Sequence, residues 1–134
     1  MRTTLFLAAI AIFLTMGCEP RTPATEPAEE PAAQVADDPD FQLDGDPEAG
    51  QEIYAIQCAS CHGAQGGGDG AAAAALDPSP ADFSQIELSA ARVYRVTRNG
   101  GLAANLAATM PAFGTQLNEQ QLHDVTAYVL QLGQ

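Results

Sequence analysis

The stretch Cys58-Ala59-Ser60-Cys61-His62 constrains this chain more than any other. Two cysteines three positions apart, followed directly by a histidine, form the C-x-x-C-H pattern that attaches a c-type haem. One helical turn puts both sulfurs on one side of the backbone, where each can add to a vinyl group at one porphyrin edge. His62 is then the candidate proximal ligand of the iron. The motif therefore predicts one covalently bound haem c.

Two other interpretations of the paired cysteines fit the chain less well. A structural zinc site needs four ligands, but no second cysteine pair is present and the other histidine, His123, is far away. A thioredoxin-like redox pair would follow a strand in a βαβ unit, whereas the flanking residues predict a helix and a glycine-rich loop. That loop, residues 63–70, lacks the Gly-Lys-Ser/Thr ending of a phosphate-binding loop, which argues against nucleotide binding.

The first residues resemble an export signal. Arg2 precedes an unbroken apolar run from Leu5 to Leu14, which is too short to span a bilayer but typical of a signal peptide over residues 1–17. The run ends in a sequence that resembles a bacterial lipobox, with Gly17 before Cys18 but Thr15 where leucine is favoured. Lipidation of Cys18 would account for the one cysteine that the haem does not use. Ordinary cleavage that leaves a free thiol is the alternative.

Acidic residues dominate the segment that follows. The formal net charge is −12, and residues 19–48 hold ten acidic residues against Arg21 alone. Residues 18–45, rich in Pro, Ala and acidic side chains, are predicted to form a disordered tether. The charge argues against nucleic-acid binding and suits redox partners with a basic docking patch, although it also serves simply to solvate the tether. We expect a monomer outside the cytoplasm, on the periplasmic side, held to a membrane by the lipid.

The sequence of residues 46–134 predicts a helical domain. Asp46 with Pro47 starts a first helix that is expected to continue into the haem motif, and Ser89 caps a second that extends to Asn99. Asn118 and Gln121 form a capping box for a third helix that ends at Gly133. A glycine inside a helix costs about 1 kcal/mol relative to alanine, so Gly50 predicts a close helix crossing. A short turn is expected over 71–75. Arg92, Arg95 and Arg98 are spaced to lie on one polar stripe of the second helix, where one of them could pair with a haem propionate, although a solvated helix face is the favoured role.

Met110 is the second informative residue. Pro111 fixes the backbone in a turn after it, between two predicted helices, and no other methionine lies beyond residue 16. A methionine is more often core filler, but in a haem protein it is the candidate sixth ligand. The carbonyl of Pro78 or Pro80 is a candidate acceptor for the other ring N–H of His62, with loop rigidity as the alternative role. His123 is expected on a solvated helix face.

These motifs give residues 46–134 a resemblance to the class I cytochromes c, small all-α domains with a few helices packed around one haem. The resemblance rests on Cys58-x-x-Cys61-His62 and on Met110-Pro111-x-Phe113, and also on Gly50, Tyr54 and Tyr128, where the family's terminal helices cross. It implies thioether bonds at Cys58 and Cys61, and axial ligation by His62 and Met110. Residues 63–66 and 77–83 resemble those of bacterial members found as oxidase-associated or freestanding electron carriers.

A haem with two axial protein ligands has no open position, so the leading functional prediction is a one-electron carrier rather than an enzyme. A peroxidase-like enzyme would need an open sixth site and a polar distal pocket. A redox or gas sensor would need displacement of Met110. The fourth interpretation is an electron-entry subunit of a larger oxidoreductase complex.

Overall fold

The computed structural model describes residue 38 and residues 40–134, and within these residues the fold is helical with no strand. Four α-helices, α1 (Pro47–Gln57), α2 (Ala59–His62), α3 (Ala90–Asn99) and α4 (Glu119–Leu132), are joined by loops. The loops contain three short 3-10 turns, η1 (Ala73–Ala75), η2 (Phe83–Gln85) and η3 (Leu102–Ala104). The all-α prediction is confirmed. The predicted signal peptide, Cys18 and most of the tether lie outside the described residues.

Each long helix starts where its capping residue predicts. The Asp46 side chain accepts a hydrogen bond from the Glu48 backbone N–H at 2.9 Å, with Pro47 in the first turn. Ser89 caps α3, and the reciprocal capping box between Asn118 and Gln121 opens α4. These caps satisfy backbone donors that a helix start leaves without partners.

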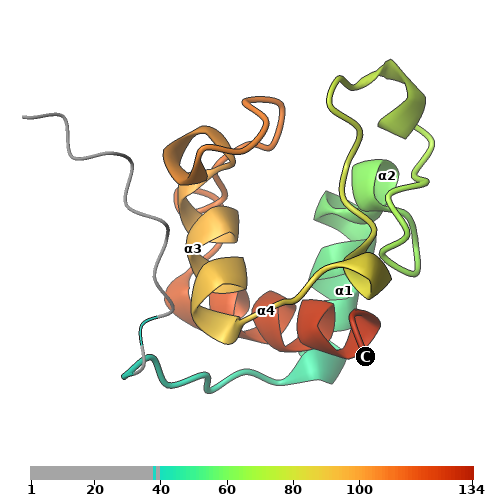
Figure 1. Cartoon of the computed structure of the whole chain (residues 1–134). Coiled ribbons are helices and arrows are strands. Elements are labelled where there is room, and N and C mark those ends of the chain that lie inside the picture. Colours follow the sequence, from blue (N-terminus) through green and yellow to red (C-terminus); the bar gives the residue numbers. More distant parts are fainter. Residues whose placement is uncertain (1–37, 39) are drawn as a thin grey trace, which may run out of the picture.

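The crossing of α1 and α4 forms the base of the domain (Figure 1). A Cβ atom added to Gly50 would lie only 2.0 Å from the backbone carbonyl oxygen of Asp124. The rings of Tyr54 and Tyr128 pack beside this contact with their centroids 5.3 Å apart. The close crossing predicted from Gly50 is confirmed. The core around it also contains Phe83, Val93, Phe113, Leu117, Leu122, Val125 and Val129.

Residues 40–46 lie along α4, although the sequence analysis assigned most of them to the tether. The Phe41 ring contacts Tyr94 and His123, with centroid distances of 5.0 and 5.5 Å. The Asp44 backbone N–H donates to Nδ1 of His123 at 3.1 Å, and the Asp46 N–H donates to Oδ1 of Asp124 at 2.8 Å. The packed part of the chain therefore extends back at least to Phe41. Among the described residues, no helix has both the length and the hydrophobicity to cross a membrane.

Candidate haem site

A cavity of about 540 Å³ opens between α2 and the loop that follows α3. This volume lies within the range of about 300–1,000 Å³ that is typical of cofactor sites. Cys58, Cys61 and His62 line it from the α2 side, and Met110 lines it from the loop. None of the residues around this cavity is aspartate, glutamate, lysine or arginine. The fold thus brings the four predicted haem-contacting residues together around one uncharged space.

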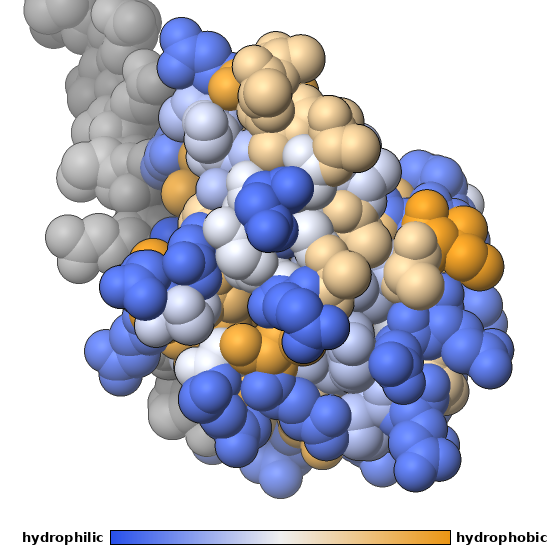
Figure 2. Space-filling model, turned by 90° about the vertical axis from the view of Figure 1, so that its right-hand side faces the viewer, coloured by the Kyte–Doolittle hydropathy of each residue, from blue (hydrophilic) through white to orange (hydrophobic). Residues whose placement is uncertain are grey.

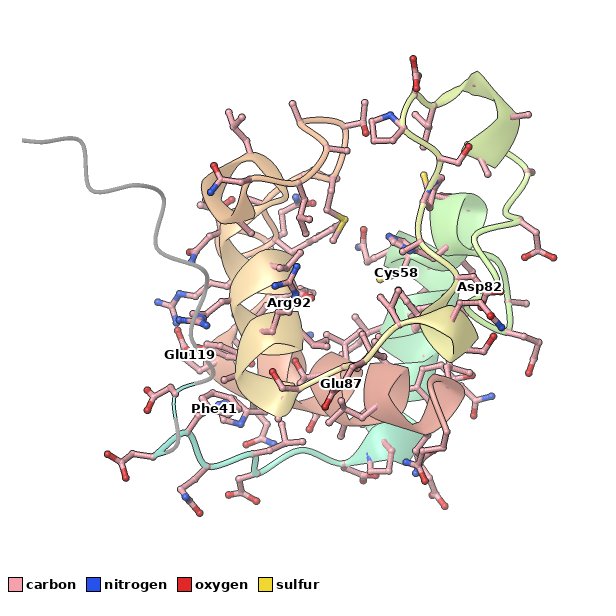
Figure 3. The ribbon with its side chains drawn as sticks, viewed as in Figure 1. Phe41, Cys58, Asp82, Glu87, Arg92 and Glu119 are labelled. Atoms are coloured by element: carbon pink, nitrogen blue, oxygen red, sulfur yellow. The ribbon has the colours of Figure 1, made fainter. Side chains whose placement is uncertain are left out.

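A second cavity of about 110 Å³ is lined by three of the same residues, Cys58, His62 and Met110. Its wall adds Tyr54, Arg92 and aliphatic side chains from α3 and α4. Figure 3 shows Cys58 at the end of α1 and Arg92 on α3 on opposite sides of the space between the two halves of the domain. The two cavities thus border the same cysteine, histidine and methionine.

A break in the helix positions the C-x-x-C-H residues. The predicted first helix stops at Gln57, and the chain restarts at Ala59 as the single turn α2. The Cys58 backbone carbonyl accepts from the N–H of Cys61 at 3.1 Å and of His62 at 2.9 Å, so that turn is intact. Gly63 ends it with a φ of +80°, a conformation that glycine adopts without strain.

His62, the last residue of α2, packs against the turn η2. Its ring stacks on Phe83, with centroids 5.0 Å apart and an angle of 26° between the planes. Nδ1 of His62 is buried and has no hydrogen-bond partner. Pro78 and Pro80 line the larger cavity, as His62 does, so the predicted bond from His62 to one of their carbonyls stays a prediction.

Burial changes the ionisation of two groups at the site. It lowers the pKa of His62, which favours the neutral imidazole that can donate a lone pair to a metal. It also raises the pKa of the Cys58 thiol to about 11, with a smaller contribution from Cys61. Both shifts favour the uncharged form of the side chain.

Backbone hydrogen bonds hold Met110 in its loop. Its carbonyl accepts from the Gly101 N–H at 3.0 Å, and its own N–H donates to the Ala107 carbonyl at 3.1 Å. The next residues return to α3, where the Phe113 N–H donates to the Thr97 carbonyl at 2.9 Å. Gly100, with a φ of +82°, makes the turn out of α3 that this loop requires. The thioether is therefore presented by a folded loop rather than a free one.

Tyr54 has a contact that the sequence analysis did not find. Its hydroxyl is buried and donates to the carbonyl of Gly63, the residue after His62, at 2.8 Å. The sequence pattern predicts Tyr54 only as an aromatic residue at the helix crossing. The signal for this hydrogen bond is a tyrosine, rather than a phenylalanine, on a buried helix face. A buried hydroxyl needs a hydrogen-bond partner.

The residues present fit a covalently bound haem. The space has two thiols and a neutral imidazole on one wall, a thioether on another and an uncharged lining, and the buried Nδ1 of His62 still lacks a partner. His123 lines neither cavity and packs instead against Phe41 and Tyr94. Fold and site together define a class I c-type cytochrome.

The family follows from a match over most of this domain. Residues 45–129 match the family model described as cytochrome c oxidase, cbb3-type, subunit III, and the chain belongs to that family. It carries a covalently bound haem c and functions in haem-based electron transfer. The predictions of family, cofactor and general function are confirmed.

Two relatives show how far the likeness extends. The gluconate 2-dehydrogenase cytochrome c subunit of Pantoea cypripedii is 35% identical over 92 residues, which cover 63% of this chain and 20% of that protein. A chain of the Kuenenia stuttgartiensis reducing HAO-like protein complex is 31% identical with a TM-score of 0.55, over 65% of this chain and 43% of that one. This chain therefore matches a fifth of the first relative and less than half of the second.

Proposed function

We propose that this protein is a one-electron carrier in which Cys58 and Cys61 bind the haem through thioethers while His62 and Met110 are its two axial ligands. The observation that supports this assignment is that Cys58, His62 and Met110 line both cavities, with Met110 coming from a separate loop. When bound, the haem supplies an iron that alternates between the ferric and ferrous states. The side chains around the haem would determine whether the iron could also bind a substrate.

Four features of the chain favour electron transfer over substrate chemistry. With His62 and Met110 both bound to the iron, no coordination position would remain for a substrate. The soft thioether of Met110 favours the ferrous state and raises the reduction potential relative to two histidines. The hydrogen-bonded loop keeps Met110 in place without bound substrate. The wall of the larger cavity offers no aspartate, glutamate, lysine or arginine as an acid or base.

The optical spectrum of the full-length haem-loaded protein tests the ligand assignment. We expect a far-red charge-transfer band in the oxidised form and no change on adding carbon monoxide to the reduced form. A high-spin oxidised spectrum, or carbon monoxide binding to the reduced form, would show that Met110 is not a firm ligand. A sensor or a peroxidase-like enzyme would then be the better interpretation.

The cellular setting in this proposal is an exported lipoprotein. Residues 1–17 are the signal peptide, Cys18 carries the lipid and the acidic tether follows, all outside the described residues except for the tether's last residues. Several acyl chains on Cys18 would hold the domain stably at a membrane on the periplasmic side, as a single chain would not. Replacing Cys18 with serine should release the haem protein from the membrane fraction, and retention of that variant would contradict lipid anchoring.

A second candidate is an electron-entry subunit of a larger oxidoreductase. It is favoured by the relatives, one of which is named as a cytochrome c subunit and the other as part of a protein complex. After gentle extraction from the membrane and separation by size, a free carrier would elute as a small monomer. A subunit would elute together with other redox proteins. For either role, the acidic surface suits partners with a basic docking patch. Such a partner should bind more weakly as the salt concentration rises.

A further inference from the structure

The loop that carries Met110 buries little of its own surface. It follows α3 and lies at the end of the domain opposite the α1–α4 crossing (Figure 1). Within residues 101–110, all of them in the described part of the chain, Gly101 alone is buried. The two leucines of the loop face solvent, with Leu102 72% and Leu106 44% exposed. Hydrophobic burial therefore does little to fix this loop, and its backbone contacts must do so.

Three backbone hydrogen bonds of the loop meet at Gly101. Its N–H donates to the carbonyl of Met110, at the far end of the loop, at 3.0 Å. Its own carbonyl accepts from the N–H of Ala104 at 2.9 Å and from the N–H of Leu106 at 2.8 Å. Gly101 thus joins the start of the loop both to its middle and to the methionine.

Space, and not backbone conformation, requires glycine at position 101. Gly101 has a φ of −65° and a ψ of −38°, which alanine adopts without strain. Replacing glycine with alanine in such a conformation ordinarily stabilises a chain. Here an added Cβ atom would lie 2.2 Å from the carbonyl oxygen of Ala107 and 3.0 Å from Cβ of Met110. The backbone of the loop and the candidate ligand both occupy the space that a side chain would need.

We propose that Gly101 is a positioning residue for Met110, because the lack of a side chain there lets the loop close far enough to present the thioether to the haem cavity. This inference rests on the proposed function, since it takes Met110 as the sixth ligand. A methyl group at position 101 would fit only if the segment from Ala107 to Met110 moved away from it. That strain would be relieved when Met110 leaves the iron, so a competing ligand would bind more tightly.

Imidazole titration of the oxidised, full-length haem protein tests the proposal, with loss of the far-red band reporting displacement of Met110. Gly101→Ala should raise the apparent affinity for imidazole by about tenfold or more, because overpacking strain favours the displaced state. Gly50→Ala is the matched control, since its added Cβ atom would be crowded by backbone at 2.0 Å but at the α1–α4 crossing. The control should lower the Tm yet change the imidazole affinity by less than about twofold. Equal effects of the two variants on this affinity, or no effect of Gly101→Ala, would overturn the proposal.

Amide hydrogen exchange of the wild-type protein decides the question even if Gly101→Ala fails to mature. The Gly101 amide should exchange at least about 100-fold more slowly than in an unstructured chain, because it donates within the closed loop. Saturating imidazole should reduce this protection by about tenfold or more, since the acceptor is the carbonyl of the displaced Met110. Unchanged protection would mean that the ligand moves independently of Gly101, and the proposal would be wrong. Failure of the proposed function would look different, because the oxidised wild-type protein would then lack the far-red band before imidazole is added.

Discussion

Gly50→Ala tests how far the packing of α1 on α4 determines the stability of this domain. The added methyl group would lie 2.0 Å from the Asp124 carbonyl oxygen, 2.5 Å from its carbon and 3.0 Å from Cβ of Tyr128. An ordinary contact between carbon and oxygen is about 3.3 Å, so α4 would have to retreat by more than about 1 Å. Backbone atoms cannot rotate away as a flexible side chain can. The strain must therefore spread into the α1–α4 contact.

The net effect is a balance of two terms. Forcing a methyl group into a packed contact costs about 1–3 kcal/mol, and the backbone neighbour places this site near the upper end. The better helix propensity of alanine offsets about 1 kcal/mol of this cost. We expect a net loss of about 2 kcal/mol in the free energy of unfolding, which lowers the Tm by about 8–16 °C in a domain of this size.

Thermal unfolding of the haem-loaded protein, followed by far-ultraviolet circular dichroism, measures this effect. Gly67→Ala is the matched control, because its added Cβ atom would meet nothing closer than Asp69 Oδ1 at 3.4 Å and its φ is not positive. The control should change the Tm by no more than about 4 °C. A Gly50→Ala protein as stable as the wild type, or more stable, would refute the close crossing as the reason for glycine at this position.

Three further changes test other parts of the site and surface. Tyr54→Phe leaves the Gly63 carbonyl buried without its donor and should cost about 1–3 kcal/mol in denaturant unfolding, whereas Tyr128→Phe, at the same ring contact, should cost less. Met110→Ala should remove the far-red band and let the reduced protein bind carbon monoxide, and a variant inert to carbon monoxide would contradict ligation by Met110. The hydrogen bond from Tyr94, with the nearby Arg98, lowers the pKa of Glu119 in the folded state. The stabilising contribution of Glu119 is therefore full above its ordinary pKa of 4.5 and is lost as the pH falls through the lowered folded-state value, so the Tm difference between wild type and Glu119→Gln should shrink at acid pH. A difference that instead grows below pH 4.5 would show that the sign is wrong.

Local signals allowed the helices to be predicted well. Asp46, Ser89 and Asn118 each cap a helix in the structure as the sequence predicts, because capping depends on residues two or three positions apart. The turn over 71–75 is present as η1. The restart of the chain at Ala59 was missed, since no local residue marks the break.

Contacts between distant parts of the chain could not be predicted in this way. The packing of Phe41 against Tyr94 and His123 joins three segments that no periodicity relates. Its acidic and proline-rich neighbours instead favour disorder. The hydrogen bond from Tyr54 to Gly63 was missed for a related reason. A buried tyrosine hydroxyl needs an acceptor, but the sequence does not show which group supplies it.

Hydrophilic and hydrophobic residues occupy different parts of the surface, which composition alone cannot reveal. On the face in Figure 2, hydrophilic residues cover most of the area, and moderately hydrophobic residues gather at its upper end. The exposed alanines at 71, 72, 74 and 75 belong to η1 and the turn that leads into it, which lie at that end of the domain in Figure 1. The net charge of −12 therefore describes the chain as a whole but not every part of its surface.

The packing of residues 40–46 on α4 also has a mechanical consequence. If Cys18 is anchored as proposed, any pull on the tether reaches the domain first through Phe41 and the hydrogen bonds of Asp44 and Asp46 to α4. The load then passes into the α1–α4 crossing, where Gly50 lies directly against the backbone of Asp124. Phe41 also contacts Tyr94 on α3, the helix that precedes the Met110 loop, so tension in the tether would strain both the base of the domain and this helix.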